Sequence, residues 1–238
     1  MSESVVYPGR DLEAMSFAIN YHKWILDEFR PFLGRRIVEV GAGTGSFSEM
    51  LLAENPESLT LIEPSEMFDQ LTATLAGPHG NTRLSFYHNK FTEVSDTLSA
   101  PDSIIYVNVL EHIEDDDAEM AAIRETLVPG GRCFIFVPAM KSLYGEFDRR
   151  IGHFRRYDKS ALEEKCRKAG LTVVSSRYFD LFGVVPWWVK YKLLRSDSLG
   201  SGAVTLYDKI AVPVTRLFES VIRPPLGKNI LLIAERAS

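Results

Sequence analysis

A short strand that runs directly into a glycine turn is the feature that most limits how this chain can fold. Residues 36–40 are rich in β-branched side chains, and the turn Gly41-Ala42-Gly43-Thr44-Gly45 follows them at once. A helical pattern then resumes over residues 46–53. Glycines in such a turn let the backbone come close to a ligand, because a Cβ atom would block the approach. The pattern predicts a buried strand with a ligand site at its carboxyl end.

Strand and helix patterns alternate along most of the remaining chain. The alternation predicts an α/β fold, a doubly wound and mostly parallel sheet with helices on both faces. The expected strands cover residues 36–40, 59–62, 84–87, 103–109, 131–137, 171–177 and 229–234. The expected helices cover residues 11–32, 46–53, 67–75, 116–127 and 160–169.

The length of 238 residues fits one domain, so we expect residues 1–238 to fold as a single unit. Residues 1–33 are expected to form an N-terminal helical lid. Two insertions are expected on the substrate side, at residues 139–157 and 178–226. The first is predicted to be an irregular loop. The second is predicted to hold two helices, around residues 186–188 and 205–218, joined by a flexible loop at 196–202.

Charge and hydropathy exclude several classes of protein. A protein that binds nucleic acid by neutralising its phosphates needs an excess of basic residues, whereas this chain has a net charge of −5. We therefore expect no nucleic acid as partner. The start of the chain shows no secretory pattern, and no run of about 18 apolar residues is present. We therefore expect a cytoplasmic protein without a spanning segment. Peripheral contact with a membrane surface is one possible role of an aromatic cluster; the alternatives are a lid over an apolar acceptor and packing in the core. The cluster comprises Phe179, Phe182, Trp187, Trp188 and Tyr191.

Glu63 stands where a ribose-binding acid belongs. It follows the second expected strand, about 20 residues after the glycine turn, and a carboxylate there can accept two hydrogen bonds from a sugar diol. Ser46 occupies the place of the third glycine in a dinucleotide fingerprint, which departs from pyrophosphate binding. The alternative is a turn that only packs a helix on a strand, with Glu63 as a solvated cap.

These residues and several ordered blocks resemble the class I S-adenosylmethionine-dependent methyltransferases. The blocks are Tyr21-His22-Lys23-Trp24, Val107-Asn108-Val109-Leu110-Glu111-His112-Ile113 and Leu127-Val128-Pro129-Gly130-Gly131. The resemblance implies a Rossmann-like sheet of seven strands, the last antiparallel, and S-adenosylmethionine as cofactor.

The resemblance also assigns roles to matching positions around the cofactor. It implies that the turn holds the methionine part through Gly41, Ala42, Gly43 and Gly45. It implies that Glu39 orients the amino group, that Glu63 with Pro64 binds the ribose, and that Asn108 and Val109 line the sulfonium region. Many members carry an acid after the third strand to contact adenine. This chain has His88-Asn89-Lys90 instead, so Asn89 or the backbone is expected there.

The run Gly152-His153-Phe154-Arg155-Arg156-Tyr157 resembles a bacterial small-molecule subgroup of these enzymes with a His-x-Arg-Arg-Tyr loop. Guanidinium groups bind carboxylate or phosphate in a bidentate manner, so Arg155 and Arg156 are expected to clamp an anionic acceptor. The alternative is surface ion pairing with Asp148, Asp158 and nearby glutamates. The other expected acceptor-binding residues are Tyr21, Tyr144 and Tyr157.

His112 and His153 are the candidate general bases, since an imidazole titrates near neutral pH. The alternative for each is support, His112 packing beside the cofactor and His153 steadying the arginines. Residues 115–117, a run of three aspartates, are expected to cap a helix, and no metal site is predicted.

The sequence as a whole predicts methyl transfer from S-adenosylmethionine to a small, acidic or sugar-derived metabolite, at oxygen. Two alternatives stay open. A nicotinamide-dependent oxidoreductase is disfavoured by Ser46 and by Ala161, which stands where a Tyr-x-x-x-Lys pattern beginning at Tyr157 needs lysine. A non-catalytic S-adenosylmethionine-binding protein is the second alternative. The sequence gives no indication of oligomeric state.

Overall fold

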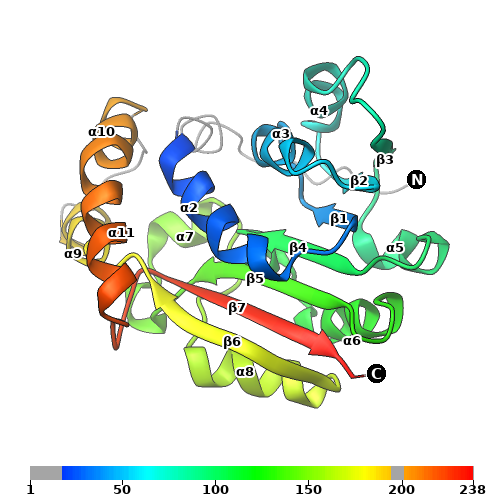
Figure 1. Ribbon diagram of the computed structural model, residues 1–238. Helices are drawn as coiled ribbons and strands as arrows, with labels where there is room; N and C mark the ends of the chain where they lie inside the picture. The colour runs from blue at the N-terminus through cyan, green and yellow to red at the C-terminus, as the bar shows by residue number, and fades with distance from the viewer. Residues whose placement is uncertain (1–17, 194–200, 238) are drawn as a thin grey trace.

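One twisted sheet runs through the protein, described over residues 18–193 and 201–237 in a computed structural model (Figure 1). Its strand order is β3-β2-β1-β4-β5-β7-β6. The strands β1 to β5 run parallel, and β7 lies antiparallel between β5 and β6. The predicted seven-stranded sheet with an antiparallel last strand is confirmed. The strands are β1 (Arg36–Val40), β2 (Ser58–Ile62), β3 (Arg83–Tyr87), β4 (Ser103–Val107), β5 (Arg132–Pro138), β6 (Leu171–Phe179) and β7 (Asn229–Arg236).

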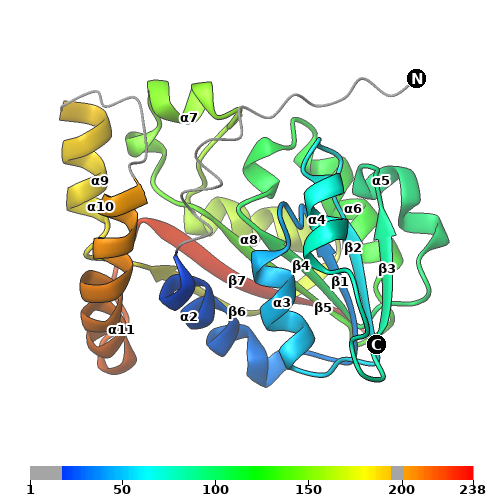
Figure 2. The same ribbon diagram turned by 90° about the horizontal axis from the view of Figure 1, so that it is seen from above.

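Helices cover both faces of this sheet (Figures 1 and 2). On one face lie α2 (Ile19–Phe29), α3 (Ser46–Ala53), α4 (Phe68–Thr74), α10 (Ser201–Leu206) and α11 (Val212–Val221). On the other lie α5 (Phe91–Val94), α6 (Asp116–Thr126) and α8 (Lys159–Lys168). The short helices α7 (Glu146–Arg150) and α9 (Val184–Trp187) lie in the two expected insertions.

Shorter helical turns complete the chain path. The 3-10 turns are η1 (Arg30–Phe32), η2 (Ser95–Thr97), η3 (Leu110–His112) and η4 (Lys141–Leu143), and two π-helical segments are η5 (Trp188–Leu193) and η6 (Tyr207–Ala211).

The central strands are apolar on both sides, which divides the core into two layers. Along β5, Cys133, Ile135 and Val137 pack into the layer under α6 and α8. Phe134 and Phe136 point the other way, into the layer under α2 and α3. Successive side chains of a strand alternate between faces, so a strand buried on both faces must be apolar throughout. Both cysteines, Cys133 and Cys166, are buried free thiols.

The insertions differ in part from the expectation. The segment 139–157 was expected to be irregular, yet it contains η4 and α7, whose short length leaves no helical period to detect. Ser201 and Gly202, expected in a flexible loop, begin α10; the rest of that loop, residues 196–200, lies outside the described residues. The start of the expected N-terminal helix, before residue 18, lies outside them too. None of the helices in the described parts of the chain is long and apolar enough to cross a membrane.

The strand order creates a crevice at the carboxyl edge of the sheet. From β1 the chain continues outward to β2 and β3, whereas β4 returns to the opposite side of β1. Val40 at the end of β1 is in register with Tyr106 near the end of β4. Ligands of open α/β sheets bind at such a reversal. The glycine turn after β1 and the residues after β4 therefore open onto the same crevice.

Candidate functional site

A cavity of about 800 Å³ opens at this carboxyl edge. Its size lies within the range of about 300–1,000 Å³ that is usual for ligand pockets. Seven of the predicted cofactor residues line it: Gly41, Gly43, Glu63, Pro64, Asn89, Asn108 and Val109. The predicted bases and two of the predicted acceptor residues line it as well: His112, His153, Tyr21 and Arg156. The structure thus places residues predicted for the cofactor and for the acceptor in one cavity. The part lined by Gly41, Gly43 and Glu63 is called the cofactor end after that prediction, and the part lined by Tyr21 and Lys228 is called the acceptor end.

The glycine turn forms one wall of the cofactor end. Gly41 has φ +69°, and a Cβ atom there would lie 2.4 Å from Cγ2 of Val109. Gly43 has φ +56°, and a Cβ atom there would meet no protein atom within 4 Å. The first glycine is required by protein packing, while the second leaves open space along the cavity wall. This arrangement fits a ligand that lies against the backbone of the turn.

Glu63 is held in place by the backbone on both sides. The amide of Gly43 donates to its Oε2 at 2.8 Å, and the amide of Ser65 donates to its Oε1 at 2.9 Å. The side chain is only 4% exposed, yet it lines the cavity. Each carboxylate oxygen has a second lone pair, so both can still accept from a neighbouring pair of sugar hydroxyls. The alternative of a solvated cap does not describe this buried carboxylate.

Asn108 adopts a backbone conformation that few residues tolerate. Its φ is +54°, and its amide donates to the carbonyl oxygen of Phe136 at 2.8 Å. Asparagine is enriched in this left-handed region, which is otherwise sparsely populated outside glycine. The conformation turns the chain sharply after β4 and brings Asn108 and Val109 to the cavity, where Val109 lies beside Gly41 of the glycine turn.

Three predicted cofactor residues, Glu39, Ala42 and Gly45, lie behind the cavity wall. Ser48 donates to Oε2 of Glu39 at 2.5 Å, at the first turn of α3. Burial raises the pKa of Glu39 to about 8; the Ser48 bond opposes the shift and the charge of Glu63 adds to it. Glu39 therefore supports the turn from below as a protonated acid at neutral pH.

A cluster of three titratable groups, Glu111, His112 and His153, lines the cavity. The rings of His112 and His153 meet edge to face, with their centroids 4.6 Å apart. Burial, with a further contribution from His153, lowers the pKa of His112 to about 3, which makes it a weak base. Beside them lies the fully buried Glu111, whose pKa burial raises to about 7 against the opposing charges of His153 and Arg156.

The loop that carries Arg155 and Arg156 is held in place by ion pairs of both arginines. Nε of Arg156 donates to Oδ1 of Asp148 at 2.7 Å, and both side chains are 1% exposed. Nη1 of Arg155 lies 2.6 Å from Oδ1 of Asp116. Asp148 is thus a partner of Arg156, as the alternative supposed, but the pair is buried and not at the surface. Arg155 pairs with Asp116, which the alternative did not include. Of the two arginines, the structure brings Arg156 alone to the cavity.

Tyr144 and Tyr157 also use their hydroxyls within the protein. The hydroxyl of Tyr144 donates to the carbonyl oxygen of His153 at 2.8 Å, and that of Tyr157 donates to Oδ2 of Asp116 at 2.7 Å. These contacts hold the loop in place, and neither Tyr144 nor Tyr157 lines the cavity. The expectation that Tyr144, Tyr157 and Arg155 touch the acceptor has no support in their positions.

A polar network missed by the sequence analysis closes the acceptor end. Tyr21 donates its hydroxyl to Asp180 at 3.1 Å, and Nζ of Lys228 lies 2.8 Å from the same carboxylate. Nζ of Lys228 also lies 4.9 Å from the ring centroid of Tyr21 and 5.8 Å from that of Trp187. Asp180 and Lys228 lie far from Tyr21 in the chain and in no motif, so no local signal marks them.

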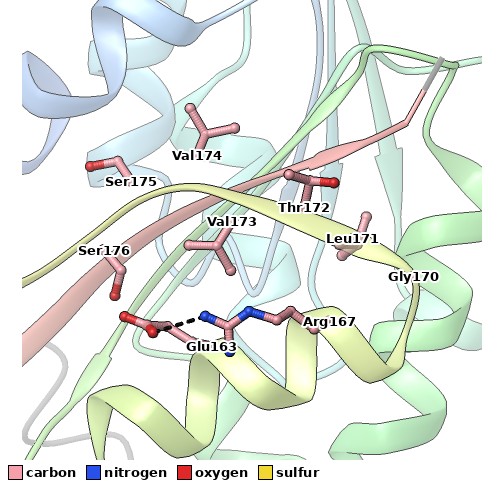
Figure 3. A pocket seen from close by; sticks show the side chains of 9 residues that line it. All are labelled: Glu163, Arg167, Gly170, Leu171, Thr172, Val173, Val174, Ser175 and Ser176. Carbon is pink, nitrogen blue, oxygen red and sulfur yellow. Dashed lines mark hydrogen bonds and ion pairs between the residues drawn. The ribbon is translucent and has the colours of Figure 1, made fainter.

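A shallower hollow lies elsewhere, between α8 and the outer strand β6 (Figure 3). The ion pair of Glu163 and Arg167 crosses it, with 3.1 Å between Oε2 and Nη2. It lies toward the start of β6, where Leu171 pairs with Arg236, at the opposite edge of the sheet from the glycine turn. None of the predicted site residues lines it.

Comparison with known proteins supports one family. A family model described as a methyltransferase domain matches residues 18–176, well over half of the 238 residues. The N-methyltransferase NodS of Bradyrhizobium japonicum, solved with S-adenosylhomocysteine, has the same fold. Its TM-score is 0.58 at 17% identity, with 93% of this chain and 87% of NodS covered.

Two sequence relatives cover different shares of the chain. A ubiquinone biosynthesis O-methyltransferase of Mesorhizobium japonicum is 22% identical over 219 residues, which is 88% of this chain and 76% of the relative. An uncharacterised protein of Synechococcus is 35% identical over 112 residues, which is 46% of this chain. The chain spans 27% of the length of that Synechococcus protein.

Proposed function

Because the chain belongs to the methyltransferase-domain family and takes S-adenosylmethionine as its methyl donor, we propose that it methylates a hydroxyl oxygen of a small acidic or sugar-derived acceptor. The observation that carries this proposal is the continuous cavity. Gly43 and Glu63 line one part of it, and His153 and Tyr21 line the other. The alternative of a nicotinamide-dependent oxidoreductase is rejected because the chain belongs to a methyltransferase family.

The cofactor end has the groups that S-adenosylmethionine needs. Glu63 would bind both ribose hydroxyls, since its two oxygens are already fixed by backbone amides. The turn at Gly43 would hold the methionine part, and Asn89 would lie near the adenine. When bound, the cofactor supplies a methyl group on a positively charged sulfur, whose transfer is an in-line displacement. Positioning of donor and acceptor then supplies much of the rate.

The acceptor end favours a flat or apolar body that carries an acidic group. Aromatic side chains of Tyr21, Trp187 and Tyr207 line it, and Lys228 stands among them. Nζ of Lys228 has three N–H donors and Asp180 accepts one, so the ammonium can still bind a carboxylate of the acceptor. Lys228 and the buried Arg156, which line the cavity, are the cations that we propose for an anionic acceptor in place of Arg155.

Oxygen is the proposed acceptor atom for two reasons. The Mesorhizobium relative is named as an O-methyltransferase. In this chain, His112, His153 and Glu111 gather on the cavity wall, where a hydroxyl must lose its proton during transfer. We propose that this cluster faces the acceptor oxygen.

Methyl transfer from labelled S-adenosylmethionine to a panel of small hydroxy acids tests the proposal. The panel would contain aromatic hydroxy acids and sugar acids, each beside its neutral amide and its amine counterpart. We expect an O-methylated product and slower turnover of the neutral amides. Transfer to the amines alone would overturn oxygen as acceptor. Binding of S-adenosylhomocysteine without turnover of any compound would favour the non-catalytic alternative.

A further inference from the structure

Three side chains with metal-binding atoms meet on the cavity wall. Glu111 and His112 belong to η3, and His153 follows α7. One ligand atom from each, a carboxylate oxygen or a ring nitrogen, lies within 4.8 Å of the other two. All three residues line the cavity.

The carboxyl group of Glu111 lacks the contacts that a buried group needs. The residue is 0% exposed, and neither carboxylate oxygen has a hydrogen-bond partner in the described part of the chain. Its Oε1 lies 3.8 Å from Nε2 of His153, which is too far for a hydrogen bond. A buried carboxyl group left in this state is costly, and a ligand on the cavity side would remove the cost.

Each of the two histidine rings is oriented by a contact between its Nδ1 and an oxygen atom of the protein. Nδ1 of His112 lies 3.2 Å from the carbonyl oxygen of Gly152, and Nδ1 of His153 lies 3.2 Å from Oδ1 of Asp148. A carbonyl oxygen and a carboxylate accept only, so Nδ1 carries the proton in each ring and the lone pair lies on Nε2. Metal-binding histidines typically donate their second N–H to a carbonyl or carboxylate in this way.

We propose that Glu111, His112 and His153 bind one divalent transition-metal ion of the zinc class. Two imidazole nitrogens and one carboxylate are a ligand set of zinc enzymes, and they leave a coordination position for a further oxygen. The sequence analysis expected no metal, because 40 positions separate the two histidine blocks and no short spacing marks them. The site itself is independent of the proposed reaction.

The role of the ion rests on the proposed function. A bound divalent ion would hold the acceptor oxygen and lower the pKa of its hydroxyl, whose proton would leave to solvent water.

Titration of the untagged, metal-free full chain with Co²⁺, a spectroscopic substitute for Zn²⁺, tests the site. We expect one ion per chain, with visible absorption bands that Zn²⁺ removes by competition. Glu111→Ala and His153→Ala should each weaken binding by at least about 10- to 100-fold, the loss typical of removing even an outer partner of a ligand. His79→Ala removes an imidazole outside the cavity and should leave binding unchanged.

S-adenosylhomocysteine binding, measured on the same variants, shows that each is folded. Absence of Co²⁺ and Zn²⁺ binding by the wild-type chain, with S-adenosylhomocysteine still bound, would overturn the site. Equal metal affinity in wild type, Glu111→Ala and His153→Ala would overturn it as well, because the ion would then lie elsewhere. Metal binding that follows the prediction, without methyl transfer to any hydroxyl acceptor, would leave the site standing and reject the proposed function.

Discussion

The cofactor end and the acceptor end of the cavity are built in different ways. At the cofactor end, backbone amides of Gly43 and Ser65 hold Glu63, and all three lie at the ends of neighbouring strands. At the acceptor end, Tyr21, Asp180 and Lys228 come from distant parts of the chain and hold one another through side chains. Changes at the first end should therefore act on cofactor affinity, whereas changes at the second should act on stability and on acceptor binding.

The largest effect is expected from Arg156→Ala. Its guanidinium and the carboxylate of Asp148 are both buried, so the variant leaves a buried charge without its cation. Removing one partner of such a pair costs about 3–5 kcal/mol of unfolding free energy. Urea denaturation measures this loss.

Arg155→Ala is the matched control for that variant. Arg155 is 30% exposed, and Asp116 keeps its hydrogen bond from Tyr157, so the loss should be below about 1 kcal/mol. The KM for the acceptor should not change. A clear rise of that KM in Arg155→Ala would restore the anion clamp predicted from the sequence and contradict the structure.

The pH dependence of stability should change in Glu39→Gln. The folded-state pKa of Glu39 is raised from the usual 4.5 to about 8, so its stabilising contribution is complete below pH 4.5 and is lost as the pH rises through 8. Glutamine keeps an oxygen for Ser48 and does not titrate. Without cofactor, the variant should gain roughly 2–4 kcal/mol relative to wild type between pH 5 and pH 8. Urea unfolding at several pH values measures the difference, and parallel curves would contradict a raised pKa.

Glu63→Ala should reduce cofactor affinity. Loss of charge-assisted bonds worth about 1.5–3 kcal/mol should weaken S-adenosylhomocysteine binding by roughly 10- to 100-fold. Calorimetry measures the affinity. Glu57→Ala is the control, since that carboxylate pairs with exposed Arg83 at the other edge of the sheet. Equal affinity in the two variants would remove Glu63 from the site.

Among the effects on ligand binding, that of Lys228→Met should be the smallest, and it should fall on the acceptor. The variant keeps the apolar stem beside Tyr21 and Trp187 but removes the ammonium. We expect KM for acidic acceptors to rise about 10-fold, the loss of one charge-assisted bond, with KM for neutral amides little changed. Cofactor affinity should stay within about 2-fold, again on the scale of bond energies. Equal increases for acidic and neutral acceptors would show that Lys228 has a structural role.

The same contrast explains what could be predicted from the sequence. Gly41 and Gly43 were found because their positive φ values require glycine, and Glu63 because one strand-helix-strand unit fixes its distance from the turn. The strand β5 could be predicted because a strand that is buried on both faces is apolar throughout. Glu111 and Lys228 were missed because their partners depend on the folding of the two insertions. Arg155 and Arg156 are neighbours of the same residue type, so the sequence does not distinguish them. In the structure Arg156 forms a buried ion pair with Asp148, whereas Arg155 pairs with Asp116 at the start of α6.

A crystal structure with S-adenosylhomocysteine tests the central claim most directly. The account predicts both ribose hydroxyls on the carboxylate of Glu63, the methionine part along Gly43, and the sulfur directed toward His153 and Lys228. A ligand bound at any other place, or one whose sulfur faced away from the acceptor end, would contradict the account.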